Sequence, residues 1–135
     1  MLTTIAPFPL TPSINYLVHI LNDMDDNSKP LIVRCQSGDD DLGYKLLKKG
    51  ESFSWKFKLH FFADTLFFCR IRWGNEKNRI FDAFEEEIDN RICEVHARDG
   101  DYFWKANSKG IYFSCDGENF RKRCEWDQNI ECTDW

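Results

Sequence analysis

The sequence predicts an all-β fold, a small antiparallel β-sandwich with an Ig-like arrangement of two sheets, tied by disulfides and with little or no helix. Short runs rich in Val, Ile, Phe, Tyr and Trp recur along the 135 residues, with turn residues between them. The apolar content is strongly aromatic, with 12 Phe, 5 Trp and 4 Tyr against 2 Met, which suits two facing sheets. Six cysteines are many for so short a chain and favour a disulfide framework.

Strands are expected along most of the chain. The apolar runs and turn signals place them at about 15–21, 30–37, 42–47, 51–58, 64–74, 78–84, 91–97, 101–106, 110–115 and 119–126. The run from Glu51 to Lys58 alternates most clearly, because Phe53, Trp55 and Phe57 would share one face and polar residues the other. One face of this strand should therefore line the core and the other should be solvated.

Two hairpins are predicted from Asp-Gly pairs. Asp99-Gly100 and Asp116-Gly117 each lie between two expected strands, and Asp-Gly suits the positive φ angles of a two-residue hairpin turn. The strands that such turns connect must be antiparallel. The second turn would place Phe113 opposite Phe120.

The cysteines are expected to pair with one another, because none has the C-x-x-C spacing of a structural zinc site. Strand alternation turns Cys35, Cys69 and Cys93 toward the core, Cys93 on the same face as Val95. If all six are paired, at least one bridge must join this group to the other three, since each group is odd. We favour Cys35 with Cys69, which leaves Cys93 for the crossing bridge. The disulfide candidates are Cys35, Cys69, Cys93, Cys115, Cys124 and Cys132.

The length fits one domain. We expect a flexible N-terminal tail at 1–13, a β-sandwich domain at 14–126 and a C-terminal tail at 127–135. The first residues lack a basic region and are interrupted by Pro7, Pro9 and Pro12, so we do not expect them to form a signal peptide. Because disulfides indicate an extracellular protein, we expect a leader that has been removed. No run of residues is apolar enough to suggest membrane insertion.

Several function classes are disfavoured. The formal net charge of -5 offers no basic field for nucleic acid. His19, His60 and His96 are dispersed, without zinc-ligand spacing. The run Asp39 to Asp41 fits a turn between strands better than a Ca²⁺ loop, and the adjacent carboxylates Glu85 to Glu87 would rarely converge on one glycosidic bond. We therefore expect no cofactor, no metal and no enzymatic activity.

A set of aromatic side chains leaves one alternative open. At strand spacing these residues are more often core than a sugar-stacking platform, but Phe61 and Phe62 are a surplus that could be exposed. A lectin-like carbohydrate-binding module is therefore the alternative function. The set comprises Trp55, Phe57, Phe67, Trp73 and Trp104.

Three blocks carry a resemblance: Cys35-Gln-Ser-Gly-Asp-Asp-Asp-Leu-Gly43, Phe53-Ser-Trp-Lys-Phe57 and Thr65-Leu-Phe-Phe-Cys-Arg-Ile-Arg-Trp73. Together with Trp104-Lys-Ala-Asn-Ser-Lys-Gly-Ile-Tyr112, they resemble the self-incompatibility protein family of flowering plants. The resemblance implies a secreted, disulfide-tied β-sandwich without enzymatic activity, some members acting as stigma ligands read by a pollen-surface receptor. The chain departs from the family at Tyr102, where a cysteine is often found, so bridge connectivity is not carried over.

We therefore expect a secreted, monomeric, non-enzymatic signalling ligand or protein-interaction module. Its partner would be a cell-surface membrane protein receptor, which recognises polar loops mounted on a rigid frame. Two charged segments that lack apolar periodicity are the best candidates for those loops. They comprise Asn75, Glu76, Lys77 and Asn78, and then Glu85, Glu86, Glu87, Asp89 and Asn90.

Overall fold

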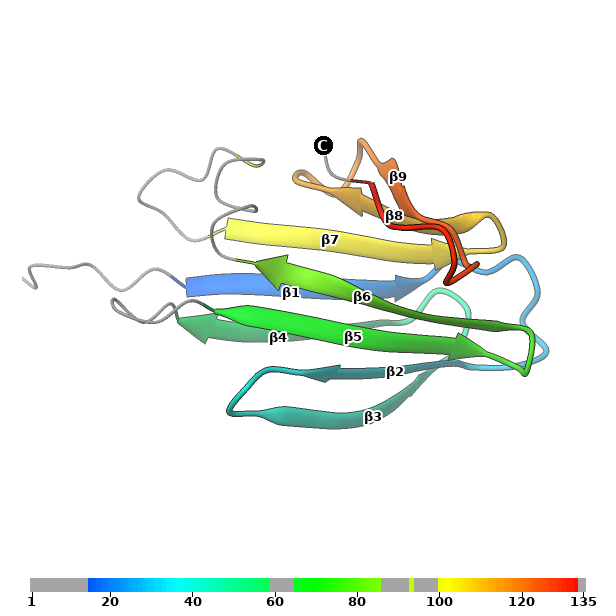
Figure 1. The fold of residues 1–135 in the computed structure, drawn as a ribbon, viewed down its shortest axis with the longest axis horizontal. Helices are drawn as coiled ribbons and strands as arrows, with labels where there is room; N and C mark the ends of the chain where they lie inside the picture. Colours follow the sequence, from blue (N-terminus) through cyan, green and yellow to red (C-terminus); the bar gives the residue numbers. More distant parts are fainter. Residues whose placement is uncertain (1–14, 59–64, 86–92, 94–99, 134–135) are drawn as a thin grey trace, which may run out of the picture.

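The fold consists of two packed β-sheets. A computed structural model describes residues 15–58, 65–85, 93 and 100–133. Within these ranges the strand order is β4-β1-β7-β8-β9 in a five-stranded sheet and β3-β2-β5-β6 in a four-stranded sheet. Figure 1 shows the two layers, with β5 and β6 crossing in front of β1 and β4. The all-β prediction is confirmed, and the described residues contain no helix, so none that could cross a membrane.

The strands agree with the expected ranges to within a few residues. The expected strand at 91–97 lies outside the described residues except for Cys93, which lies in a turn. The observed bounds are β1 Asn15–Asn22, β2 Leu31–Gln36, β3 Asp41–Leu47, β4 Ser52–Lys58, β5 Leu66–Trp73, β6 Lys77–Glu85, β7 Gly100–Asn107, β8 Gly110–Ser114 and β9 Arg121–Cys124.

The core between the sheets is aromatic. Tyr16 and Tyr102 on the five-stranded sheet pack against Phe84 of the other sheet, and Trp104 packs against Phe81. All five side chains are buried. The indole Nε1 of Trp104 donates to the carbonyl of Ala83 at 2.9 Å, across the two layers. Large rings therefore fill the space between the sheets, and the Trp104 indole hydrogen-bonds to the opposite layer.

One strand pair runs parallel. β1 pairs with β7 from Tyr16 opposite Gly100 to Asn22 opposite Ala106, and every other pairing among the described strands is antiparallel. The sequence predicts only antiparallel pairs, because an Asp-Gly turn gives the relative direction of only the two consecutive strands that it joins. The long connection between β1 and β7 includes β2 to β6, so it can return the chain in either direction.

The second of the two predicted two-residue turns is wrong. The first, at Asp99-Gly100, falls partly outside the described residues, which resume at Gly100, the first residue of β7. Residues 115–120 form a longer loop, so Phe113 lies opposite Arg121 instead of Phe120. The reason is local hydrogen bonding that lengthens the loop: Asp116 Oδ1 accepts the N–H groups of two residues that follow it.

Three disulfides tie the sandwich. The predicted Cys35–Cys69 bridge is confirmed, and Cys93 makes the crossing bridge, to Cys115. The third joins Cys124 to Cys132. Cys35 and Cys69 are fully buried as expected, but Cys93 lies half-buried in a turn, which corrects its expected place on a core-facing strand.

Candidate recognition surfaces

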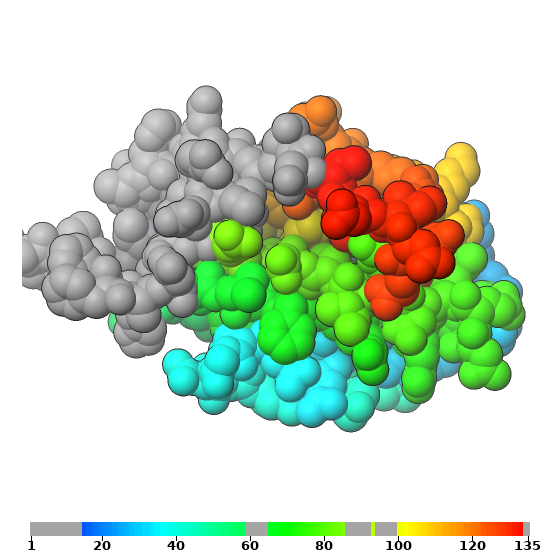
Figure 2. Space-filling view, in the orientation of Figure 1, coloured from blue at the N-terminus to red at the C-terminus, as the bar shows by residue number. Residues whose placement is uncertain are grey.

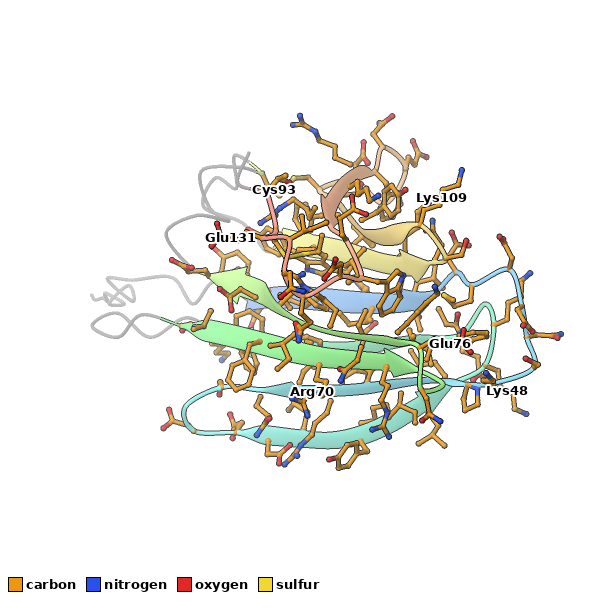
Figure 3. The ribbon with its side chains drawn as sticks, turned by 45° about the vertical axis from the view of Figure 1, so that its right-hand side comes forward. Lys48, Arg70, Glu76, Cys93, Lys109 and Glu131 are labelled. Atoms are coloured by element: carbon orange, nitrogen blue, oxygen red, sulfur yellow. A yellow bond between two sulfur atoms is a disulfide. The ribbon has the colours of Figure 1, made fainter. Side chains whose placement is uncertain are left out.

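One end of the sandwich brings together the β1–β2 loop (23–30) and the β5–β6 turn (74–76). Lys29 Nζ lies 3.5 Å from Glu76 Oε1 and 4.7 Å from the ring centre of Trp73, whose Nε1 donates to the Lys29 carbonyl at 3.3 Å. Figure 3 brings this end forward and shows Glu76 and Lys48 there. We call it the turn end. Charged side chains at this end project from two loops that the contacts of Lys29 hold together.

The first predicted recognition segment is only partly a loop. Asn75 and Glu76 are exposed in the turn, but Lys77 and Asn78 belong to β6, opposite Trp73 and Arg72. The reason is Gly74, whose φ of 60° lets the chain reverse within three residues. Sequence composition alone does not reveal so short a turn.

The second predicted segment begins inside a strand. Glu85 is the last residue of β6 and pairs with Leu66, which corrects its placement in a loop. Glu86, Glu87, Asp89 and Asn90 lie outside the described residues. The same holds for His60, Phe61, Phe62 and His96.

The acidic run after β2 forms a tight turn, as predicted. Ser37 Oγ accepts the N–H groups of Asp39 and Asp40 at 3.4 and 3.1 Å. Asp41 accepts two hydrogen bonds from Arg34 and one from the backbone N–H of Gly43. The Arg34 guanidinium, followed by the Gly43 N–H, holds the pKa of Asp41 below its usual range. The described residues contain no group of three potential metal ligands.

Ser54, His19 and Asp101 lie side by side on the outer face of the five-stranded sheet. Ser54 Oγ is 2.6 Å from His19 Nδ1, and Asp101 Oδ1 is 3.1 Å from His19 Nε2. Phe103 stacks on the imidazole with ring centres 4.7 Å apart. A hydrolase would also need donors aimed at a developing oxyanion, but strand N–H groups lie in the plane of the sheet and not above it. The arrangement is suited to tying β4, β1 and β7 together.

The aromatic set considered for sugar stacking is mainly core. Trp55, Phe67, Trp73 and Trp104 are buried, and Phe57 is half-buried between Tyr16 and the opposite sheet. The prediction that they pack inside is confirmed for these four. This set therefore offers no flat exposed platform for a sugar ring.

A buried arginine that the sequence reading missed anchors the residues after β9. Arg79 is 6% exposed. Its Nη1 donates to the carbonyls of Asp127 and Ile130 at 2.6 and 2.7 Å, and its Nη2 lies 3.1 Å from Cys132 Sγ. Strand alternation could have revealed it, because Arg79 shares the core-facing side of β6 with Phe81. Together with the Cys124–Cys132 bridge, it holds this segment against the sandwich edge.

These features define a small, disulfide-tied, two-sheet β-sandwich with charged turns on a rigid frame. Residues 17–126 match the family model of plant self-incompatibility protein S1, and the chain belongs to this family. Its members are small, secreted, non-enzymatic plant proteins.

Individual relatives of the chain support this family assignment. S-protein homolog 2 of Arabidopsis thaliana is 40% identical over 123 residues, which cover 88% of this chain and 73% of that protein. S-protein homolog 24 of the same plant is 39% identical over 88 residues, which cover 65% of this chain and only 55% of that protein. The chain thus spans about half the length of some of the curated relatives it matches.

The fold is also that of a solved family structure. A self-incompatibility protein homologue, described as one of a widespread family of small, highly stable, secreted plant proteins, aligns with a TM-score of 0.62. The alignment covers 86% of this chain and 97% of that one at 19% identity, so this likeness shows the fold alone. In the present chain, Tyr102 is fully buried, and Cys93 bonds Cys115 instead of a cysteine at that position.

Proposed function

We propose that this protein is a secreted ligand for a membrane protein receptor on the surface of plant cells. The observation that carries the proposal is the match of residues 17–126 to a family named for self-incompatibility, a process in which one cell recognises another. Three disulfides and an aromatic core supply a rigid frame. Such frames commonly carry recognition in their exposed loops.

The turn end contains Asn75 and Glu76, the two described residues of the predicted recognition segments that lie in a turn. Asn75 and Glu76 are exposed there, beside the acidic loop that contains Asp25 and Asp26. Exposed carboxylates add little to folding stability, but they change the rate at which a charged partner associates. We therefore assign steering of a basic receptor loop to this end. We include residues 86–90 in the proposed receptor-binding region on the basis of sequence alone.

The proposal is tested with labelled protein and plasma-membrane vesicles from plant tissue. The expected result is saturable binding that excess unlabelled protein displaces and that protease treatment of the vesicles abolishes. Glu76→Gln should slow association about two- to fivefold, whereas Glu118→Gln, an equal charge change in the β8–β9 loop, should not. Crosslinking and mass spectrometry would then identify the receptor.

Two results would contradict the proposal. Absence of protease-sensitive binding would mean that no receptor protein is recognised. Binding that survives protease but is lost after glycosidase treatment would instead indicate the lectin-like alternative.

A further inference from the structure

The outer face of the four-stranded sheet carries large apolar side chains in the open. Tyr44 and Leu46 are each 63% exposed and Ile80 is 39% exposed. The pairing register places Tyr44, Arg34, Arg70 and Ile80 in one row across β3, β2, β5 and β6. Leu46, Ile32 and Arg72 form the next row. We call this surface the arginine face; it comprises Arg34, Tyr44, Leu46, Arg70, Arg72 and Ile80.

Two arginines on this face have no ion-pair partner among the described residues. Arg34 pairs with Asp41 and lies 4.9 Å from the ring centre of Tyr44. The exposed guanidinium groups of Arg70 and Arg72 form no ion pair with another residue in the described part of the chain. The whole chain carries a formal charge of -5. The middle of this face is therefore positive on an otherwise acidic protein.

The face is visible as one surface. Figure 2 shows residues of β2, β3, β5 and β6 contiguous across the lower part of the view, and Figure 3 places Arg70 amid this sheet, away from Glu76 at the turn end. Tyr and Arg side chains are enriched at the energetically dominant centre of protein interfaces, and here they lie beside exposed Leu46 and Ile80. Scattered single apolar residues would need no such explanation.

We propose that the arginine face docks a folded protein domain whose surface presents carboxylates within an apolar patch. Charge complementarity carries the choice of partner. Arg70 and Arg72, which form no ion pair within the described part of the chain, can pair with the partner's carboxylates, while Tyr44, Leu46 and Ile80 bury apolar area around them. The inference rests on the proposed function, since it assumes a receptor, and it adds a second contact surface to the turn end.

Two other occupants fit less well. A second copy packed by two-fold symmetry through this face would bring its arginines against the same arginines. An anionic membrane attracts clusters of many basic residues, whereas Asp82 and Glu85 of β6 flank this face and the chain is acidic as a whole. The experiment therefore includes both as outcomes.

The test compares two double variants with equal changes in charge. R70Q/R72Q removes the two arginines that lack an ion pair within the described residues, and K56Q/K58Q removes two exposed lysines of β4 on the other sheet. The probes are plant plasma-membrane vesicles before and after protease treatment, and protein-free phosphatidylcholine vesicles containing phosphatidylserine. R70Q/R72Q should bind the untreated membranes about tenfold more weakly than wild type, and K56Q/K58Q should bind like wild type. The affinities of wild type and K56Q/K58Q should fall steeply with salt, whereas the residual affinity of R70Q/R72Q should fall less.

The outcomes separate the two proposals. If wild type shows no protease-sensitive binding, the proposed function and this inference both fail. If wild type binds and R70Q/R72Q binds equally well, or if K56Q/K58Q loses as much, only the arginine face is refuted. If wild type binds the protein-free vesicles and R70Q/R72Q does not, the partner of the arginine face is an anionic lipid surface and not a protein. Concentration-dependent self-association that R70Q/R72Q abolishes would replace it with a second copy.

Discussion

Arg34 and Arg70 lie directly opposite each other on β2 and β5, both on the solvent side of the four-stranded sheet. Like charges in this position destabilise a sheet. Arg34 also forms an ion pair with Asp41, whereas Arg70 has no ion pair with the described residues. This part of the sheet is therefore better suited to binding than to stability.

Replacing Arg70 should stabilise the fold. Arg70→Thr removes the like-charge pair and introduces a residue that favours strands, so the melting temperature should rise by about 1–3 °C in low salt. The gain should shrink in high salt, which screens the repulsion. Lys56→Thr is the control, because Lys56 lies opposite Leu17 and not opposite a charge. A lower melting temperature for Arg70→Thr would mean that Arg70 has a stabilising partner.

Asp116 should make stability depend on acid pH. The backbone N–H groups of Asn119 and Glu118, then the Asn119 amide and the Ser114 hydroxyl, hold the pKa of Asp116 well below its usual range. The folded state thus favours the carboxylate, and its contribution is full above the unfolded pKa of about 4 and is lost as the pH falls below it.

Asp116→Ala should therefore melt at a lower temperature than wild type at pH 7, and the difference should narrow on acidification below about pH 4. Calorimetry at neutral and acid pH checks this. Glu118→Ala in the same loop is the control, since only its N–H takes part in the loop hydrogen bonds described above. A difference between Asp116→Ala and wild type that stays constant down to pH 2 would contradict the assignment.

Arg79 should matter far more to stability than Arg72. Arg79→Met leaves the carbonyls of Asp127 and Ile130 without their charged donor, so it should lower the free energy of unfolding by roughly 2–4 kcal/mol. Arg72→Met, at an exposed position on the neighbouring strand, should change it by less than about 0.5 kcal/mol. Urea unfolding measures both, and equal effects would refute the anchoring role.

The three bridges should differ in their resistance to reductant. Cys35 and Cys69 are fully buried, whereas Cys115 is exposed, and thiol exchange requires access to a sulfur. Limited reductant followed by alkylation and peptide mapping should label Cys93 and Cys115 before Cys35 and Cys69. C93S/C115S should cost about 3 kcal/mol of stability in the chain-entropy model, given its separation of 22 residues. Earlier labelling of Cys35 would show that the sheet opens first.

Local patterns predicted much of this fold. Alternation of apolar and polar residues identified the core-facing side of β4. The Cys35–Cys69 bridge was predicted because both cysteines were expected to face the core on central strands. The parallel β1–β7 pair could not be predicted in this way, because strand pairing over a long connection depends on packing of the whole sandwich. The length of the β8–β9 loop was predicted wrongly. The Asp116 carboxylate accepts hydrogen bonds from the N–H groups of Glu118 and Asn119, and the Asp-Gly pair alone does not reveal these bonds.

The recognition surfaces were harder to predict than the frame. Charge and poor periodicity located the β5–β6 turn, but they misplaced Lys77 and Glu85, which belong to β6. The arginine face could not be predicted from the sequence, because its residues come from four strands. Only the pairing register between these strands brings Tyr44, Arg34, Arg70 and Ile80 into one row. A single sequence gives the face of each strand but not the neighbours across the sheet.

The most direct test of the account is a side-chain footprint of the protein bound to plant plasma membranes. Hydroxyl-radical oxidation read by mass spectrometry compares Tyr44, which is 63% exposed on the arginine face, with Tyr112 on β8 of the other sheet. Saturating membranes should protect Tyr44 from oxidation several-fold and leave the oxidation rate of Tyr112 unchanged. A saturated complex in which Tyr44 oxidises at the free rate would contradict the account.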